Sequence, residues 1–146
     1  MRQLTVLLVE DNPRDVRLTQ RAFMRVGLSH DLRVVRDGDE ALAYLQRDGA
    51  YKEPSSAPRP DVILLDLNLP RMGGHDVLRR LKQDPRFKQV PIIVLTTSGR
   101  PDDVRLAYEA GANAYLLKPV EFARFTEIMS QLGKFWLEIV ELPPEV

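Results

Sequence analysis

Hydrophobic and polar positions along the chain form two alternating kinds of segment. Short runs of consecutive apolar residues are typical of strands that are covered on both faces, and they alternate with longer stretches of helical periodicity. The predicted strands are residues 4–9, 31–36, 62–66, 91–97 and 114–118. The predicted helices begin near Asn12-Pro13, Asp39, His75, Pro101 and Glu121.

This alternation predicts the fold class. Strands that alternate with helices build right-handed βαβ units, and therefore a parallel sheet with helices on both faces. We expect residues 1–146 to form a single flavodoxin-like, doubly wound α/β domain with five strands in the order 2-1-3-4-5 and an extended C-terminal helix. The more polar strand at 31–36 is expected at an edge of the sheet. Residues 48–60, DGAYKEPSSAPRP, predict an exposed loop.

Composition excludes several classes of protein. The 146 residues are 44% hydrophobic and 29% charged, which is typical of a globular domain. Lys plus Arg and Asp plus Glu both number 21, and this zero net charge argues against DNA binding. The absence of cysteine excludes disulfides and a thiol nucleophile. The apolar run at 4–9 is too short for a signal peptide or a membrane span, so we expect a cytoplasmic protein without a membrane partner.

Polar side chains with related chemistry follow four of the five predicted strands. In a doubly wound sheet the carboxyl ends of the strands share one edge, so we expect these side chains to lie close together. Clustered carboxylates repel one another and favour a bound cation, and an all-oxygen site suits Mg²⁺. With a lysine and a hydroxyl beside them, they indicate a phosphoryl-transfer site. The residues are Glu10, Asp11, Asp66, Thr96 and Lys118.

In this order and at these strand ends, the motifs resemble the receiver domain of two-component response regulators. The resemblance covers roughly residues 4–132 and includes the turn DLNLPRMGG that begins at Asp66. It implies that Asp66 is the phosphoacceptor, and that Thr96 and Lys118 bind phosphoryl oxygens. It also implies that the chain is a phosphoacceptor and signalling domain rather than a turnover enzyme.

The same resemblance implies a set of Mg²⁺ ligands. Asp11, Asp66 and the backbone carbonyl of Asn68 would bind the ion directly, and Glu10 would act through water. Lys118 precedes Pro119, and this bond is usually cis in the family.

Two further expectations concern switching and partners. Tyr115 lies at the family's aromatic switch position and would respond to Thr96. The phosphoryl donor would be a sensor histidine kinase. The segment at 48–60, the strand end VLTTS and the extended C-terminus are similar to single-domain regulators that partner bacterial phytochromes. About 14 residues follow Leu132, too few for a DNA-binding domain, so a stand-alone receiver is expected.

Two alternatives remain from the residues alone. A phosphatase that uses an aspartyl-phosphate would carry an acid/base Asp two positions after its nucleophile, but that position is Asn68, whose amide cannot shuttle protons. A flavin or nucleotide carrier would need a phosphate-binding Gly-rich loop after the first strand, where Glu10-Asp11-Asn12 stands instead. His30 and His75 have no partner histidine at ligand spacing and are interpreted as surface or capping residues.

The last predicted helix, from about Glu121 to Glu141, is longer than the sheet requires. It would span about 31 Å, whereas a typical strand spans about 17–20 Å. Its last two turns would then overhang the sheet as an apolar patch, which a symmetric partner would cover. We therefore predict a homodimer through the fifth strand and this helix, involving Phe122, Phe125, Phe135, Trp136 and Ile139.

Overall fold

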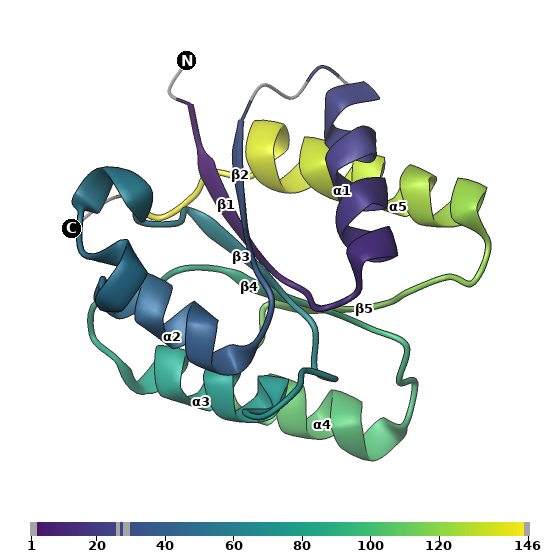
Figure 1. Cartoon of the computed structure of the whole chain (residues 1–146). Coiled ribbons are helices and arrows are strands. Elements are labelled where there is room, and N and C mark those ends of the chain that lie inside the picture. The colour runs from purple at the N-terminus through teal and green to yellow at the C-terminus, as the bar shows by residue number, and fades with distance from the viewer. Residues whose placement is uncertain (1–2, 26, 28–29, 145–146) are drawn as a thin grey trace.

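The sheet has the predicted topology. The structure, a computed structural model, describes residues 3–25, 27 and 30–144. Five parallel strands pair in the order β2-β1-β3-β4-β5 (Figure 1), which confirms the flavodoxin-like class, and the polar strand β2 lies at an edge as expected. The strands are β1 (Thr5–Val9), β2 (Asp31–Val35), β3 (Val62–Leu65), β4 (Ile92–Thr96) and β5 (Ala114–Leu117).

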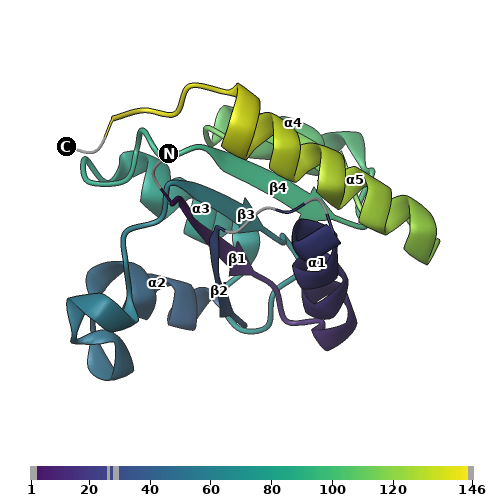
Figure 2. The ribbon, with the colours of Figure 1, turned by 90° about the horizontal axis from the view of Figure 1, so that it is seen from above.

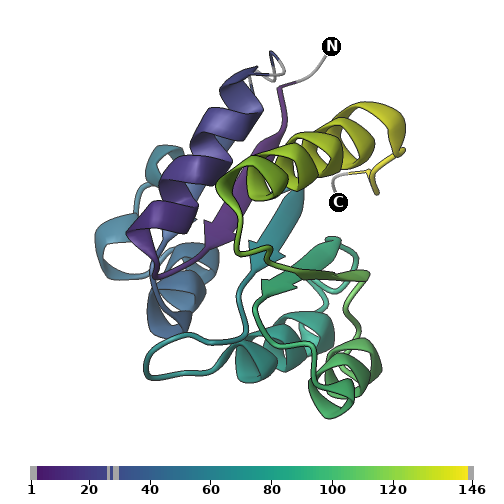
Figure 3. The ribbon, with the colours of Figure 1, turned by 90° about the vertical axis from the view of Figure 1, so that its right-hand side faces the viewer.

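Five α-helices cover the two faces of this sheet. Helices α1 and α5 lie on one face, and α2, α3 and α4 lie on the other (Figures 2 and 3). Side chains alternate along the central strands, so each face builds its own apolar cluster, for example around Leu8 and Leu64 on one side and Leu7 and Ile63 on the other. The helices are α1 (Pro13–Arg25), α2 (Gly38–Gln46), α3 (Gly74–Gln83), α4 (Pro101–Glu109) and α5 (Phe122–Lys134).

Capping side chains set the beginnings of two helices. The Arg14 backbone N–H donates to Asn12 Oδ1 at 2.9 Å, so Asn12 caps α1 as predicted, with Pro13 as the first helical residue. Asp37 caps α2 by accepting a hydrogen bond from the Glu40 N–H at 2.7 Å. No helix among the described residues has both the length and the apolar character needed to cross a bilayer.

Residues 48–60 are less exposed than the sequence predicted. They contain two short 3₁₀ turns, η1 (Gly49–Tyr51) and η2 (Pro54–Ser56). Ala57 is buried, and the Tyr44 hydroxyl of α2 donates to the Pro58 carbonyl at 2.7 Å. The expectation of an exposed loop is therefore correct for the first half of the segment and wrong for the second half, which packs against α2.

The C-terminal helix also differs from its prediction. Helix α5 ends at Lys134 and continues as one π-helical turn, η3 (Phe135–Ile139), which changes the helical phase. Leu137 is only 6% exposed, and the half-buried Trp136 and Leu142 pack against the same apolar cluster. Much of the predicted overhang therefore docks on its own domain, a possibility that helix length alone does not reveal.

Gly74 allows α3 to approach the end of β3 closely. Its N–H donates to the Leu67 carbonyl at 3.1 Å. A Cβ atom at this position would lie 2.4 Å from the Asp66 carbonyl oxygen and 2.5 Å from the Leu67 Cα. Both obstacles are backbone atoms, so they cannot move aside as the end of a flexible side chain would.

We expect Gly74→Ala to lower the free energy of unfolding by about 2–3 kcal/mol, because the backbone around Asp66 must shift to admit the methyl group. Urea denaturation followed by circular dichroism measures this change. Gly99→Ala is the matched control, since its added Cβ would meet only Leu117 methyl groups at 3.5 and 3.6 Å. Equal free energies of unfolding for the two variants would contradict the close approach at Gly74.

Candidate functional site at the carboxyl edge of the sheet

Sheet-type hydrogen bonds extend past the strand ends and hold the candidate residues in place. The Glu10 N–H donates to the last carbonyl of β2 at 2.9 Å, and the Asp66 N–H donates to the last carbonyl of β1 at 3.1 Å. The Lys118 N–H donates to the Thr96 carbonyl at 2.8 Å. The backbone therefore brings together the residues that the sequence placed at one edge.

Lys118 lies at the centre of a closed group of carboxylates. Its Nζ donates to Asp66 Oδ2 at 2.9 Å, to Asp15 Oδ2 at 3.0 Å and to Glu10 Oε1. The four side chains are at most 6% exposed. The compact ammonium thus uses all three of its donors on three carboxylates from different parts of the chain.

Burial and charge act against each other in this group. Burial raises the pKa of Glu10 above its ordinary value, although its hydrogen bond to Lys118 opposes this shift. Burial alone would lower the pKa of Lys118, but the hydrogen bonds and negative charges of Glu10 and Asp66 outweigh it and raise that pKa. Lys118 is therefore a fixed positive charge, and the negative charge around it is only partly compensated.

The acidic residues fit a divalent cation. One carboxylate oxygen from each of Glu10, Asp11 and Asp66 lies within 4.8 Å of the others. An octahedral Mg²⁺ holds neighbouring ligand oxygens about 3 Å apart and opposite ones about 4 Å apart, so small side-chain movements would complete such a set. Asp11 is exposed, which leaves the group open to solvent on one side. An all-oxygen donor set of this kind matches a hard divalent cation.

Thr96 connects the charged group to the segment that leads into α4. Its side chain is fully buried, and its Oγ1 accepts hydrogen bonds from Asn68 Nδ2 and from the Ser98 N–H, both at 3.3 Å. Asn68 in turn donates its N–H to Asp66 Oδ1 at 3.1 Å. The Tyr115 hydroxyl donates to the Ser98 carbonyl at 2.7 Å. Thr96 and Tyr115 are therefore linked through hydrogen bonds to Ser98.

Sequence reasoning missed Asp15, which is the third carboxylate on Lys118. It lies in the first turn of α1, one helical turn after Asp11, where an acidic residue is ordinarily a solvated one. Its spacing from Asp11 gave no signal, because Asp11 precedes the N-cap residue Asn12 and lies outside the helix.

Two other residues have contacts that the sequence did not reveal. His75 is half-buried, and its Nε2 lies 3.6 Å from Asp103 Oδ1, so it connects α3 to α4 rather than lying on the surface. Ser98 Oγ donates to the other oxygen of Asp103, and this hydrogen bond lowers the pKa of that carboxyl. His30 accepts a hydrogen bond from the Leu4 N–H at 2.9 Å, in keeping with a capping role.

The bond between Lys118 and Pro119 differs from the family expectation. The described residues contain no cis peptide bond, so this bond is trans. Trans is the lower-energy isomer of a peptide bond that precedes proline.

The predicted dimer residues do not form one continuous surface. Phe125 is 1% exposed and belongs to the core, so it is not available to a partner. Phe122 is exposed but lies against α1, with the Arg14 guanidinium 4.8 Å above its ring. Phe135 and Ile139 are 51% and 69% exposed, and the Phe135 ring meets Trp136 edge to face at 5.8 Å.

Known proteins are similar to this chain in both sequence and fold. The family model of the response regulator receiver domain matches residues 6–130. The response regulator Rcp1 of Synechocystis is 44% identical over 138 residues, which cover 94% of this chain and 92% of that protein.

Solved structures agree with the sequence match. The phosphorylated cyanobacterial phytochrome response regulator RcpA superposes with a TM-score of 0.92 at 40% identity, covering 98% of this chain and all of that one. The Mn²⁺-bound form of Rcp1 superposes with a TM-score of 0.90 at 42% identity, covering 97% of this chain and 99% of the other.

We expect Lys118→Met to lower the free energy of unfolding at neutral pH by about 3–5 kcal/mol, because it leaves buried carboxylates without their cation. Added Mg²⁺ should restore part of this loss by binding the folded state. Urea denaturation with and without Mg²⁺ measures both effects. Lys88→Met, at an exposed position, is the control. A Lys118→Met variant as stable as that control would show that the carboxylates do not need the ammonium.

Proposed function

The chain belongs to the response regulator receiver family, and from this premise we propose that Asp66 accepts a phosphoryl group from a sensor histidine kinase. The observation that carries the proposal is the contact between Lys118 Nζ and Asp66 Oδ2 at 2.9 Å, beside the acidic pair Glu10-Asp11. Receivers of this family act in phosphorelay signalling. The positive charge of Lys118 would stabilise the negative charge that develops on a phosphoryl group as it is transferred to Asp66.

The proposed transfer uses the groups already present. An Asp66 carboxylate oxygen attacks the phosphorus of a phosphohistidine, a P–O bond forms, and the P–N bond breaks with its electron pair returning to the imidazole. Lys118 then binds an oxygen of the new phosphoryl group instead of the carboxylate, and the Thr96 hydroxyl donates to another. Asn68 lacks an acid or base group, so hydrolysis of the aspartyl-phosphate by this chain should be slow.

We propose Mg²⁺ as the divalent cation of this site. Its ligands would be the carboxylates of Asp11 and Asp66 and the backbone carbonyl of Asn68, with Glu10 acting through water. The ion would neutralise the phosphoryl oxygens as they approach the acidic cluster. Support comes from the oxygen-only donor set and from the exposed side of Asp11.

We infer that the kinase is a phytochrome-type photoreceptor and that the chain acts as a receiver in the cytoplasm. The support is similarity: RcpA and Rcp1 are nearly the same length as this chain, and the former is a phytochrome response regulator. The output would then pass through protein contacts.

We expect Asp66→Asn to abolish phosphorylation by a small phosphodonor such as acetyl phosphate, because an amide oxygen is a poor nucleophile. Intact mass spectrometry measures the added phosphoryl group. Chelation of divalent ions before the phosphodonor is added should also prevent labelling of the unsubstituted protein. The control is Asp76→Asn on the exposed side of α3, which should be labelled like the unsubstituted protein. A labelled Asp66→Asn variant would place the acceptor elsewhere.

We further propose that Thr96 and Tyr115 form the switch. A phosphoryl oxygen near Thr96 would draw its hydroxyl away from the Ser98 N–H, and the Ser98 carbonyl is the acceptor for Tyr115. The segment after β4 would then rearrange and release the tyrosine ring. This is a local charge change that biases a two-state element.

Thr96→Ala should still be phosphorylated but should lose the phosphorylation-induced change in amide exchange near Tyr115, because the hydroxyl that connects the two is gone. Hydrogen–deuterium exchange of the phosphorylated and free forms measures the coupling. The exposed neighbour offers a control, Thr97→Ala, which should respond like the unsubstituted protein. A normal exchange response in Thr96→Ala would disprove the switch.

We propose that the chain forms a homodimer through the free edge of β5 and the adjoining flank of α5. Phe122, Ala123, Thr126 and Ser130 of α5 face α1 across a groove. At 100° per residue, Ile128 falls on the opposite flank of α5, and Phe135 and Ile139 are exposed on the π turn that follows. The proposed interface therefore consists of Ile128, Phe135 and Ile139, and Trp136 packs edge to face against the Phe135 ring.

Substituting Ser for both Phe135 and Ile139 should raise the dissociation constant of the dimer at least about tenfold, because each change removes an apolar contact twice in a symmetric interface. Sedimentation velocity over a concentration series measures this constant. Phe122→Ser is the control: it removes an equally exposed aromatic ring from the α1 flank. An unsubstituted protein that sediments as a monomer at about 100 µM, phosphorylated or not, would rule out the dimer.

A further inference from the structure

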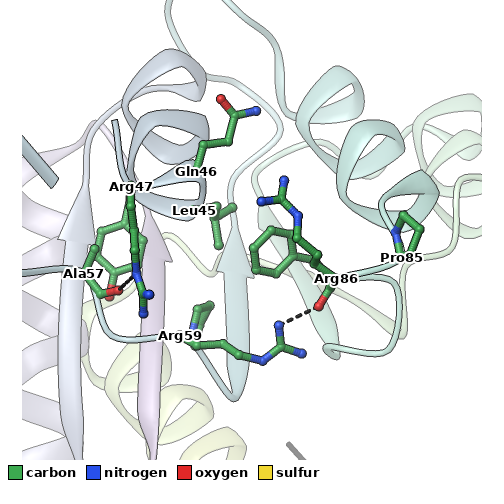
Figure 4. Close-up of a pocket in the computed structure, with 10 residues that line it drawn as sticks. Leu45, Gln46, Arg47, Ala57, Arg59, Pro85 and Arg86 are labelled. Atoms are coloured by element: carbon green, nitrogen blue, oxygen red, sulfur yellow. Dashed lines mark hydrogen bonds between the residues drawn. The ribbon is translucent and has the colours of Figure 1, made fainter. Parts of the chain in front are cut away.

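A cavity lies at the opposite edge of the sheet from Asp66. Its volume is about 420 Å³, which is within the range of small-molecule sites. The end of α2, the segment that precedes β3 and the connection from α3 to β4 form its walls. Figure 4 shows Arg47 on one side of the cavity, Arg59 and Arg86 on the other, and Leu45 between them.

The interior of this cavity is apolar. Tyr44, Leu45, Ala57 and Phe87 line it, and each of them is at most 7% exposed as a residue. Two cation–π contacts hold the Phe87 ring in place: the guanidinium carbons of Arg59 and Arg86 lie 5.4 and 5.1 Å from its centroid. The cavity therefore offers an apolar interior of fixed shape, in which the body of a small organic molecule would lose contact with water.

The rim of the cavity is positively charged. None of its ten lining residues is acidic, and three are arginines. Arg86 is neutralised by two hydrogen bonds to Asp84, at 3.1 and 2.8 Å. Arg47 and Arg59 make no ion pair within the part of the chain that the structure describes; each instead donates to a backbone carbonyl, of Ala57 and Arg86 respectively. These hydrogen bonds hold both guanidinium groups at the rim, and each group keeps further N–H donors that could bind a ligand.

We propose that this cavity binds a small organic acid, with an aromatic or branched aliphatic body inside and a carboxylate between Arg47 and Arg59. Guanidinium groups bind carboxylates through paired, charge-assisted hydrogen bonds, and the apolar interior matches a hydrocarbon body. This binding site is independent of phosphoryl transfer at Asp66.

The position of α2 favours a carboxylate over a phosphate. Helix α2 ends at the cavity, so the partial negative charge of its C-terminus faces the rim. Arg47 continues the chain there with a positive φ of 56°, and its N–H donates back to the Tyr44 carbonyl. Two arginines balance one negative charge beside such a helix end better than the two charges of a phosphate monoester.

The test titrates the full chain with 3-phenylpropanoate, its neutral amide and phenyl phosphate, and follows backbone amide shifts by NMR. We expect 3-phenylpropanoate to bind saturably with a dissociation constant of about 1 mM or below, and to shift amides around Ala57 and Phe87. The amide should bind at least about tenfold more weakly, because it cannot make charge-assisted hydrogen bonds. Phenyl phosphate should bind more weakly than the carboxylate.

Variants test the rim separately. Arg59→Met keeps the apolar stem and should weaken carboxylate binding at least about tenfold, as should Arg47→Met. Arg17→Met, an exposed arginine on α1 across the sheet, should leave binding unchanged. The proposal is overturned by an absence of saturable shifts, by shifts located elsewhere, by equal binding of acid and amide, or by tighter binding of the phosphate. Because the acid and the amide are compared on the unsubstituted protein, the outcome stands even if one arginine variant fails to fold.

Discussion

The balance of charge around Lys118 is the constraint on which the rest of this structure depends. Three buried carboxylates meet one ammonium, and Asp11 adds a fourth negative group at the surface. The three buried carboxylates lie where water cannot fully solvate them, so the folded chain tolerates them only because each is hydrogen-bonded to Lys118. The residual negative charge would attract a divalent cation, and a bound cation would offset the negative charge of an incoming phosphoryl group. Affinity for metal and readiness for phosphorylation would thus have one electrostatic origin.

The strand order explains why these residue types occur at these positions. β1 and β3 are neighbours at the centre of the sheet, so Glu10-Asp11 and Asp66, which follow these strands, lie next to each other. Lys118 follows β5, two strands from β3, a separation of about 10 Å that a long flexible side chain can cross. An ammonium suits the meeting point because its three donors can point to three separate carboxylates, whereas the planar guanidinium of arginine is matched to one. The sheet therefore fixes where the backbone of each residue lies, and the long side chain of Lys118 spans the distance from β5 to the carboxylates.

Sequence alone predicted those parts of the molecule that follow from local rules. Apolar runs identified the central strands, the polarity of residues 31–36 placed that strand at an edge, and the strand ends gathered the residues around Asp66. Where tertiary packing determines the position of a residue, the prediction was less complete. A carboxylate in the first turn of a helix looks solvated, and only the proximity of Lys118 shows that Asp15 is buried with it. The last helix was predicted to overhang the sheet from its length, but Leu137 and Leu142 return to the core after a π turn that periodicity does not indicate. Residues 48–60 have a loop-like composition, yet Ala57 is buried because the second half of this segment packs against α2.

A change of charge at Asp66 would be transmitted through the segment after β4 rather than through the sheet. The central strands are fully buried and paired on both sides, so they cannot rearrange without breaking the sheet. The segment after β4 is held differently: the Thr96 hydroxyl accepts two long hydrogen bonds, Ser98 is shared between Asp103 and Tyr115, and His75 reaches Asp103 only at 3.6 Å. The contacts of Thr96 and His75 are long and therefore weak, and all of these contacts are connected in series, so the loss of the first one would loosen the next. A phosphoryl group at Asp66 would act at the buried end of this series, and its exposed end is the surface of α4 and β5. Because the central strands are paired on both sides, the response to phosphorylation would be concentrated in the segment after β4.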